Sequence, residues 1–184
     1  MLPDLIGKRV TLRPPRHSDL VAFFYYASKP TVGPSAGWLP HQNLDESKRT
    51  LDLFIREQNI FAITINPHDV MVGTIGFHNY QNDHVFGEGC ELGFVLDDTY
   101  WNQGYMTEAV KIVIDYVFSI LKFDYLMISH ADFNIASKRV IEKNGFKFQY
   151  KTHKTFLENP DISEVWYYKM TKEDYFHDEE RTIN

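Results

Sequence analysis

Short runs of alternating or branched apolar residues recur along the chain, and turn-forming residues interrupt them. This character, which is typical of β-strands, is found at residues 9–13, 60–65, 70–80 and 91–96. Pro14-Pro15 ends the first run, Asn66-Pro67-His68-Asp69 separates the second from the third, and residues 81–89 separate the third from the fourth. Because short hinges join the last three runs, they predict three neighbouring antiparallel strands.

Amphipathic stretches with capping residues predict the helices. Ser18-Asp19 offers an N-cap for a helix over 20–27, and Asn43 with Glu46 forms a capping-box-like start for a helix to about residue 57. Asn134 caps a further helix, which Gly145 ends. A longer helix begins after Gly104, where apolar residues recur at spacings of three and four: Met106, Ala109, Val110, Val113, Val117 and Ile120.

The remaining segments complete a single domain over residues 1–184. Residues 125–129 form a strand, and the strand–helix–strand order predicts that it pairs in parallel, or nearly so, with 91–96. Residues 146–151 and 165–170 are expected to form a hairpin around Glu158-Asn159-Pro160-Asp161. The breaker-rich segment 30–40 is expected to be a loop, and the polar tail after Thr171 is expected to be frayed.

Composition narrows the class of protein. The chain has 184 residues, 43% of them hydrophobic and 15% aromatic, and no apolar run approaches the roughly 18 residues that span a bilayer. A net charge of −6 argues against a general nucleic-acid or membrane-surface binder, because such proteins engage phosphate through basic patches. The start of the chain lacks a secretory signal pattern, and the single cysteine, Cys90, fits a reducing cytosol. A cytoplasmic protein is therefore expected.

Two ordered motifs suggest a particular cosubstrate. Residues 101–109 (WNQGYMTEA) place a glycine turn at a helix start, where unpaired N–H groups and the helix dipole favour a pyrophosphate. Residues 134–146 (NIASKRVIEKNGF) follow at the spacing that resembles the GNAT N-acetyltransferases, most closely the Rim-type enzymes that acetylate N-terminal amines of ribosomal proteins. The resemblance implies an α+β fold: a mixed, mostly antiparallel twisted sheet, a splayed parallel strand pair, and helices on both faces.

The resemblance also implies residues that hold acetyl-CoA. Of the turn positions typical of the family, which fall on Trp101, Gly104 and Met106, only Gly104 fits the general pattern, although tryptophan in the first position occurs in the Rim-type branch. Asn134 would bind the pantetheine amide, and a backbone N–H near Val95 or Leu96 would stabilise the oxyanion. The pyrophosphate would be held by the backbone N–H groups of Gln103, Gly104, Tyr105, Met106 and Thr107.

Acetyl transfer to an amine needs a base for the amine and an acid for the departing thiolate. Glu91, at the start of a strand, is the first candidate base, and His78 on the preceding strand is the second. Many family members use a tyrosine as the acid, but its position is occupied here by Ile141. In the Rim-type branch the resembling role falls to a serine, which is Ser137 here.

Each candidate has a structural alternative. Asn134 is a good N-cap whether or not a ligand binds, and Ser137 can be an ordinary hydroxyl in a first helical turn. Glu91 can be a carboxylate at the rim of the site without a catalytic role, and His78 can be a hydrogen-bonded histidine of the strand. His130 and Asp132 have no third ligand at a recognisable spacing, so no metal is expected. The aromatic run Phe23-Phe24-Tyr25-Tyr26 is interpreted as core and surface aromatics rather than a stacking platform for RNA.

Two classes of function follow. The first is an acetyl-CoA-dependent N-acetyltransferase whose primary-amine acceptor is a protein N-terminus, a polyamine or an amino sugar such as an aminoglycoside. The second is a noncatalytic acyl-CoA-binding domain. In either class we expect a monomer or homodimer with no direct contact to nucleic acid or membrane.

Overall fold

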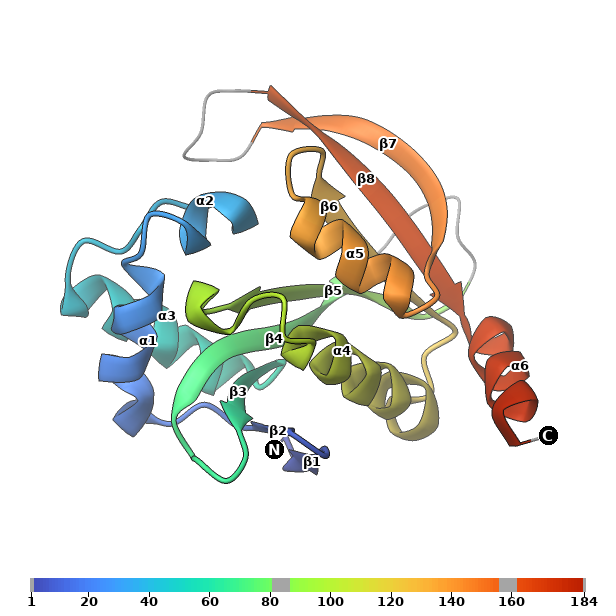
Figure 1. Cartoon of the computed structure of the whole chain (residues 1–184), viewed down its shortest axis with the longest axis horizontal. Helices are drawn as coiled ribbons and strands as arrows, with labels where there is room; N and C mark the ends of the chain where they lie inside the picture. The colour runs from blue at the N-terminus through green and yellow to red at the C-terminus, as the bar shows by residue number, and fades with distance from the viewer. Residues whose placement is uncertain (1, 81–86, 156–161, 184) are drawn as a thin grey trace.

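The computed structural model describes residues 2–80, 87–155 and 162–183 (Figure 1). Within these residues the strands form one sheet in the order β1-β2-β3-β4-β5-β6-β8-β7. Their bounds are Leu5–Ile6 (β1), Val10–Arg13 (β2), Ile60–Ile65 (β3), Met71–Tyr80 (β4), Gly89–Leu96 (β5), Tyr125–Ala131 (β6), Lys147–Thr155 (β7) and Ile162–Thr171 (β8). The helices are Leu20–Ala27 (α1), Val32–Ala36 (α2), Leu44–Glu57 (α3), Tyr105–Tyr116 (α4), Ile135–Lys143 (α5) and Lys172–Ile183 (α6). Short helical turns lie at His17–Asp19 (η1), Asp98–Tyr100 (η2) and Val117–Leu121 (η3).

The pairing of the strands confirms the predicted α+β class. Neighbouring strands are antiparallel except β5 and β6, which are parallel. The predicted trio of antiparallel strands corresponds to β3, β4 and β5, and the closing hairpin to β7 and β8. The turn expected at 158–161 lies outside the described residues, as does most of the hinge expected at 81–89.

Helices cover both faces of the sheet (Figure 1). Leu92 and Leu96 of β5 pack in one hydrophobic cluster with Val110 and Val113 of α4. On the other face, Phe23 of α1, Leu51 of α3 and other apolar residues form a second cluster, against which Val95 packs. Successive side chains of β5 thus point to opposite faces of the sheet, one packed under α4 and the other under α1 and α3, as expected for a strand.

The segment after Thr171 differs from the frayed tail expected from the sequence. Residues 172–183 form α6, and Tyr175 is buried with its ring stacked on Phe118 at 5.2 Å between centroids. The Asp174 N–H donates to the Thr171 hydroxyl, and the Thr171 N–H donates to the Asp174 carboxylate. This reciprocal cap and one buried aromatic ring stabilise a helix whose composition is otherwise polar.

Two further expectations were wrong in detail. Ile120 was expected on the apolar stripe of α4, but it is 66% exposed. The helix widens into the π-helical turn η3 there, so side chains no longer recur on the same face at spacings of three and four. Within the segment 30–40, which was expected to be a loop, residues 32–36 form α2. Gly37, at φ 87°, ends that helix in the left-handed conformation that glycine adopts without steric cost.

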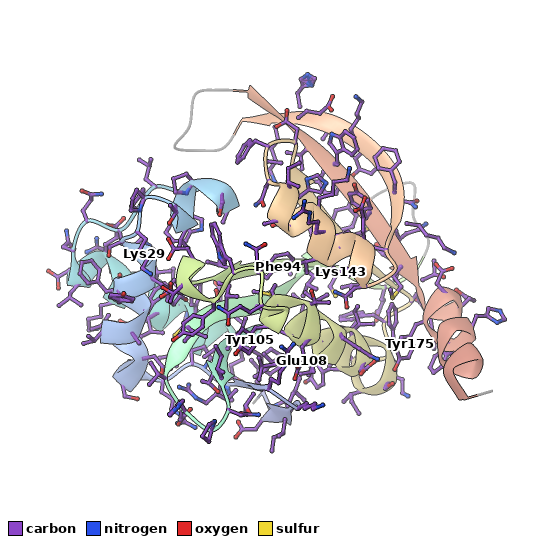
Figure 2. All side chains as sticks on the ribbon, viewed as in Figure 1. Lys29, Phe94, Tyr105, Glu108, Lys143 and Tyr175 are labelled. Carbon is purple, nitrogen blue, oxygen red and sulfur yellow. The ribbon has the colours of Figure 1, made fainter. Side chains whose placement is uncertain are left out.

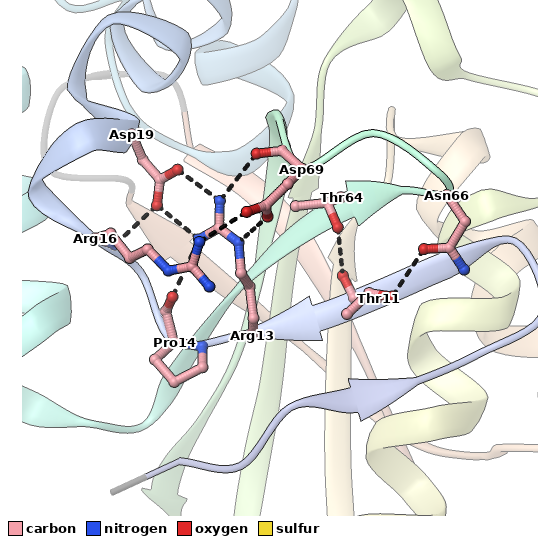
Figure 3. A network of polar contacts seen from close by, with 8 residues as sticks. All are labelled: Thr11, Arg13, Pro14, Arg16, Asp19, Thr64, Asn66 and Asp69. Atoms are coloured by element: carbon pink, nitrogen blue, oxygen red, sulfur yellow. Dashed lines mark hydrogen bonds and ion pairs between the residues drawn. The ribbon is translucent and has the colours of Figure 1, made fainter.

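A buried arginine fixes the base of α1 against the sheet (Figure 3). The Arg13 guanidinium of β2 donates to both carboxylate oxygens of Asp19, at 2.8 and 2.7 Å, and it also pairs with Asp69 in the β3–β4 turn. Arg16 pairs with the outer oxygen of Asp69 at 2.7 Å. Arg13 and Asp19 are both buried, so the pair between them has little solvent screening, whereas Asp69 and Arg16 are exposed.

Candidate functional site

The parallel strands β5 and β6 separate in the middle of the sheet. Their pairing runs from Gly89 with Tyr125 to Leu92 with Ile128. Beyond that point β5 remains paired with β4 as far as Leu96, and β6 remains paired with β8 as far as Ala131. The strands therefore diverge, which confirms the splayed pair expected from the resemblance.

A cavity of about 1460 Å³ occupies this opening. It is larger than the roughly 300–1,000 Å³ of ordinary small-molecule pockets, so it has room for a long cosubstrate and an acceptor together. Figure 2 labels Phe94 of β5, Tyr105 of α4 and Lys143 of α5, which come from three elements that line the cavity. The cavity also brings together most of the site residues predicted from the sequence: His78, Glu91, Val95, Leu96, Gly104, Tyr105, Met106, Thr107, Asn134 and Ser137.

The N-terminus of α4 faces this cavity with its backbone donors. Gly104 is the N-cap at φ 82° and supplies no side-chain cap, and the first intrahelical bond runs from the Glu108 N–H to the Gly104 carbonyl. The N–H groups of Tyr105, Met106 and Thr107 precede that bond and therefore have no intrahelical acceptor. Met106 is only 6% exposed and packs in the core, so its backbone rather than its side chain is what the turn offers a ligand.

An ion pair holds this turn against Arg9, the residue that precedes β2. Arg9 donates from Nη1 to the Gln103 carbonyl at 2.9 Å and from Nε to Glu108 at 2.8 Å. Burial alone would raise the pKa of Glu108, but the hydrogen bonds from Arg9 outweigh it and the pKa is lowered. Gln103 is exposed and lies outside the cavity lining, because its side chain turns back to donate to the Thr99 carbonyl at 3.0 Å.

Asn134 is engaged at both ends of its side-chain amide. Its Oδ1 accepts the Ser137 N–H at 3.0 Å, which is the cap expected from the sequence. Its Nδ2 donates to the Ser35 carbonyl of α2 at 2.7 Å, a contact between residues 99 positions apart. Ser137 is half-buried and lines the cavity, whereas Ile141 is completely buried in the core. A side chain at position 141 therefore points away from the cavity.

The two candidate bases lie side by side. His78 of β4 and Glu91 of β5 are direct partners in the antiparallel register, so their side chains project from the same face of the sheet. The Ser129 hydroxyl of β6 donates to Glu91 Oε1 at 2.8 Å. His78 is exposed, and its Nδ1 lies 3.4 Å from the Asn59 amide nitrogen.

Ser129 was missed by the sequence analysis. Nothing in the sequence marks a serine in the middle of an apolar strand as a partner of a glutamate 38 residues earlier. Tyr167 of β8 lies opposite Ser129 in the register. Burial first, and then the nearby charge of Glu91, raises the pKa of Tyr167 to about 12, so its phenol stays protonated at neutral pH.

His130 and Asp132 do not act together. His130 is buried, with Nδ1 at 2.8 Å from the Ala131 carbonyl and Nε2 at 3.2 Å from the Tyr168 hydroxyl. Asp132 is exposed and accepts the N–H of Phe133. His130 is therefore a hydrogen-bonded core histidine.

Comparisons with known proteins agree with this geometry. A sequence profile of the acetyltransferase (GNAT) domain matches residues 9–147. YnaD, an uncharacterised N-acetyltransferase of Bacillus subtilis, is 25% identical over 115 residues, which span 62% of this chain and 65% of YnaD. The crystal structure of a GNAT-family acetyltransferase from Bacillus anthracis superposes with a TM-score of 0.82 at 22% identity, covering 93% of this chain and 99% of that one. RimL, a ribosomal L7/L12 alpha-N-protein acetyltransferase in complex with coenzyme A, gives a TM-score of 0.76 at 15% identity over 94% of this chain and 99% of RimL.

The chain belongs to the GNAT acetyltransferase family, because the domain profile covers most of its length. Members of this family use acetyl-CoA, and Rim-type ribosomal-protein acetyltransferases are among its structural neighbours. In the part of the chain that the structure describes, every helix is too short or too polar to cross a bilayer.

Proposed function

We propose that this protein transfers an acetyl group from acetyl-CoA to a primary amine, and that the acceptor is a protein N-terminal amine. The observation that carries the proposal is the shared cavity: the N-termini of α4 and α5 border the same opening as Glu91 and His78. A donor entering between the diverging strands and an acceptor reaching Glu91 would meet there. The likeness to RimL supports the N-terminal acceptor, since RimL is an alpha-N-protein acetyltransferase.

The N-termini of α4 and α5 suit two parts of acetyl-CoA, its pyrophosphate and its pantetheine arm. Backbone N–H groups of residues 105–107 and the dipole of the twelve-residue α4 favour the negative pyrophosphate. Arg139 and Lys143 of α5 also line the cavity and add positive charge beside it. The Asn134 amide borders the path of the pantetheine arm, and it would exchange its contact with Ser35 for one with the arm.

In the reaction, the amine nitrogen forms a bond to the thioester carbonyl carbon, and the carbon–sulfur bond breaks. Glu91 accepts the proton that the amine loses, directly or through a water that His78 also contacts. Ser129 orients Glu91 for this step. A backbone N–H at Val95 or Leu96 stabilises the negative oxygen, and Ser137 returns a proton to the departing thiolate.

The demand on the base is modest for an N-terminal amine. At neutral pH, freeing an α-amino group with a pKa near ~8 costs about 1 kcal/mol, whereas a lysine-like amine near ~10.4 costs about 4–5 kcal/mol. A carboxylate acting through water therefore suffices for an N-terminal acceptor. This difference favours an α-amine over a polyamine as the acceptor of this site.

Two measurements test the proposal. Free thiol released from acetyl-CoA is followed with peptides bearing free N-termini, with polyamines and with aminoglycosides, and N-terminally blocked peptides serve as controls. Coenzyme A should also raise the melting temperature by mass action. Binding of coenzyme A without turnover of any amine would make the protein a noncatalytic acyl-CoA-binding domain. The absence of both effects would overturn the proposed cosubstrate as well.

A further inference from the structure

An aromatic wall borders the acceptor side of the cavity. We define it as Phe23 of α1, Trp38 and His41 of the loop between α2 and α3, and Phe54 of α3, all of which line the cavity. Their rings form one chain of contacts, with centroid separations of 5.6 Å for Phe54–Phe23, 5.3 Å for Phe23–His41 and 5.2 Å for His41–Trp38. These residues come from segments that pack on the face of the sheet from which Val95 projects. Glu91 projects from the same face, because it lies four residues before Val95 on the strand.

Two facing positions of the sheet beneath this region carry no side chain. Gly76 and Gly93 are partners across β4 and β5, two residues along from the pair His78 and Glu91. Both glycines line the cavity. A Cβ placed on Gly93 would meet no atom within 4 Å, so the space above it is open. A Cβ on Gly76 would instead lie 2.7 Å from Ile60 Cγ1, so the open space is above Gly93. An acceptor held at Glu91 thus has room to lay a bulky group over Gly93 and towards the aromatic wall.

Negative charge is sparse in this lining. Among the described residues that line the cavity, the carboxylates are Glu46 and Glu91. Glu46 accepts the Gln42 N–H at 2.7 Å at the start of α3, and Glu91 accepts the Ser129 hydroxyl. Of the cationic side chains in the lining, Arg139 and Lys143 of α5 lie on the donor side, beside the proposed pyrophosphate, and Lys154 adds a further positive charge. An acceptor with several ammonium groups would lose hydration without gaining enough carboxylate partners.

We infer that the acceptor carries a single amine next to a bulky apolar or aromatic group, which packs on the aromatic wall while the amine lies at Glu91. For a protein N-terminus this means a large apolar first residue, and polyamines and aminoglycosides are excluded as preferred acceptors. The inference rests on the proposed function and specifies its substrate class. Burial of the apolar group against the wall favours such an acceptor. An acceptor with a second ammonium group is disfavoured, because that group would lie in the cavity without a carboxylate partner.

The test compares three amino-acid amides with similar α-amines: phenylalaninamide, alaninamide and lysinamide. We expect kcat/KM for phenylalaninamide to exceed that for alaninamide by roughly tenfold or more, and lysinamide to fall below phenylalaninamide by at least as much. Spermidine should be the poorest acceptor. A value for lysinamide or spermidine equal to or above that for phenylalaninamide would overturn the inference and leave acetyl transfer itself intact. Failure with every amine would instead overturn the proposed function.

Substitutions locate the preference on the aromatic wall. Trp38→Ala should lower kcat/KM for phenylalaninamide by roughly tenfold while alaninamide stays within about twofold, and Trp38→Phe should restore most of the loss. Tyr25→Ala is the matched control, because Tyr25 lies on α1, is 62% exposed and is outside the cavity lining. Equal losses for both amides in a folded Trp38→Ala protein would show that the wall does not select the acceptor.

Discussion

At the scale of single residues, the proposed role of Glu91 as the base rests on its hydrogen bond with Ser129. Glu91 has one carboxylate oxygen fixed by the Ser129 hydroxyl at 2.8 Å, and its side chain is half-buried at the cavity. A carboxylate held in this way keeps its second oxygen available to an amine or a water. This geometry fits a base that takes one proton through its second carboxylate oxygen, from the amine or from a water.

Glu91→Gln should therefore lower the turnover number most at neutral pH. The loss should shrink as pH rises towards and beyond the acceptor's own pKa, near ~8 for an α-amine, because free amine then becomes abundant without a base. The measurement is a pH–rate profile of thiol release at saturating acceptor. A parallel loss at every pH would assign Glu91 to binding or scaffold rather than to proton removal.

Ser137 is the second residue whose role can be isolated. A thiol with a pKa near the ~8.5 of cysteine leaves readily as thiolate, so an acid should assist by roughly tenfold to a few hundredfold. Ser137→Ala should lower the turnover number by that factor and leave coenzyme A affinity nearly unchanged, since Asn134 caps the Ser137 backbone and not its hydroxyl. Single-turnover kinetics and calorimetric titration separate the two effects. Unchanged turnover would mean that solvent protonates the thiolate.

At the scale of elements, the start of α4 depends on one backbone conformation. Gly104 is at φ 82°, and a Cβ there would lie 3.2 Å from Nη2 of Arg9, whose side chain helps to hold the turn through its Nη1 and Nε atoms. Gly104→Val should cost about 1–2 kcal/mol of stability from the left-handed backbone alone. It should also abolish the rise in melting temperature that coenzyme A produces.

The matched control for that change is Gln103→Ala. Gln103 lies next to Gly104 but outside the cavity lining, and its carbonyl, which accepts from Arg9, is kept in the variant. This variant should retain the full shift with coenzyme A. Binding that persists in a folded Gly104→Val protein would place the pyrophosphate away from the N-terminus of α4.

At the scale of the whole molecule, the Arg13 network joins β2 to the layer that carries the aromatic wall. Asp19, immediately before α1, is 5% exposed and accepts two hydrogen bonds from Arg13. Removing Arg13 would leave that carboxylate buried without its cationic partner, with the Arg16 N–H as its remaining donor, and breaking a buried ion pair in this way typically costs about 3–5 kcal/mol. Arg13→Met should lower the free energy of unfolding by this amount in urea titrations.

Arg16→Met provides the comparison, because Arg16 also pairs with Asp69 but is half exposed. Exposed pairs contribute about 0–1 kcal/mol, so this variant should remain close to the parent. Similar losses in the two variants would show that burial does not govern the network. We instead expect Arg13→Met to lose clearly more free energy of unfolding than Arg16→Met.

The sequence by itself determined the features that depend on neighbouring residues. The glycine turn before α4, the Asn134 cap, the antiparallel trio and the parallel pair follow from local spacing and chain order, and the structure contains all of them. The family resemblance was carried by the same local motifs, and the domain profile confirms it. Even the α6 cap, Thr171 with Asp174, was present in the sequence, although the buried Tyr175 that stabilises α6 was not recognised.

Only the tertiary structure decided which distant residues meet. The Ser129–Glu91 bond depends on the register of β5 and β6, and the contact of Asn134 with Ser35 depends on where α2 packs at the cavity. The aromatic wall likewise joins residues 23 to 54 through packing that no local period encodes. Strand register and helix packing are set by the summed burial of many side chains, so a short motif predicts an element but not the partners that the element brings together.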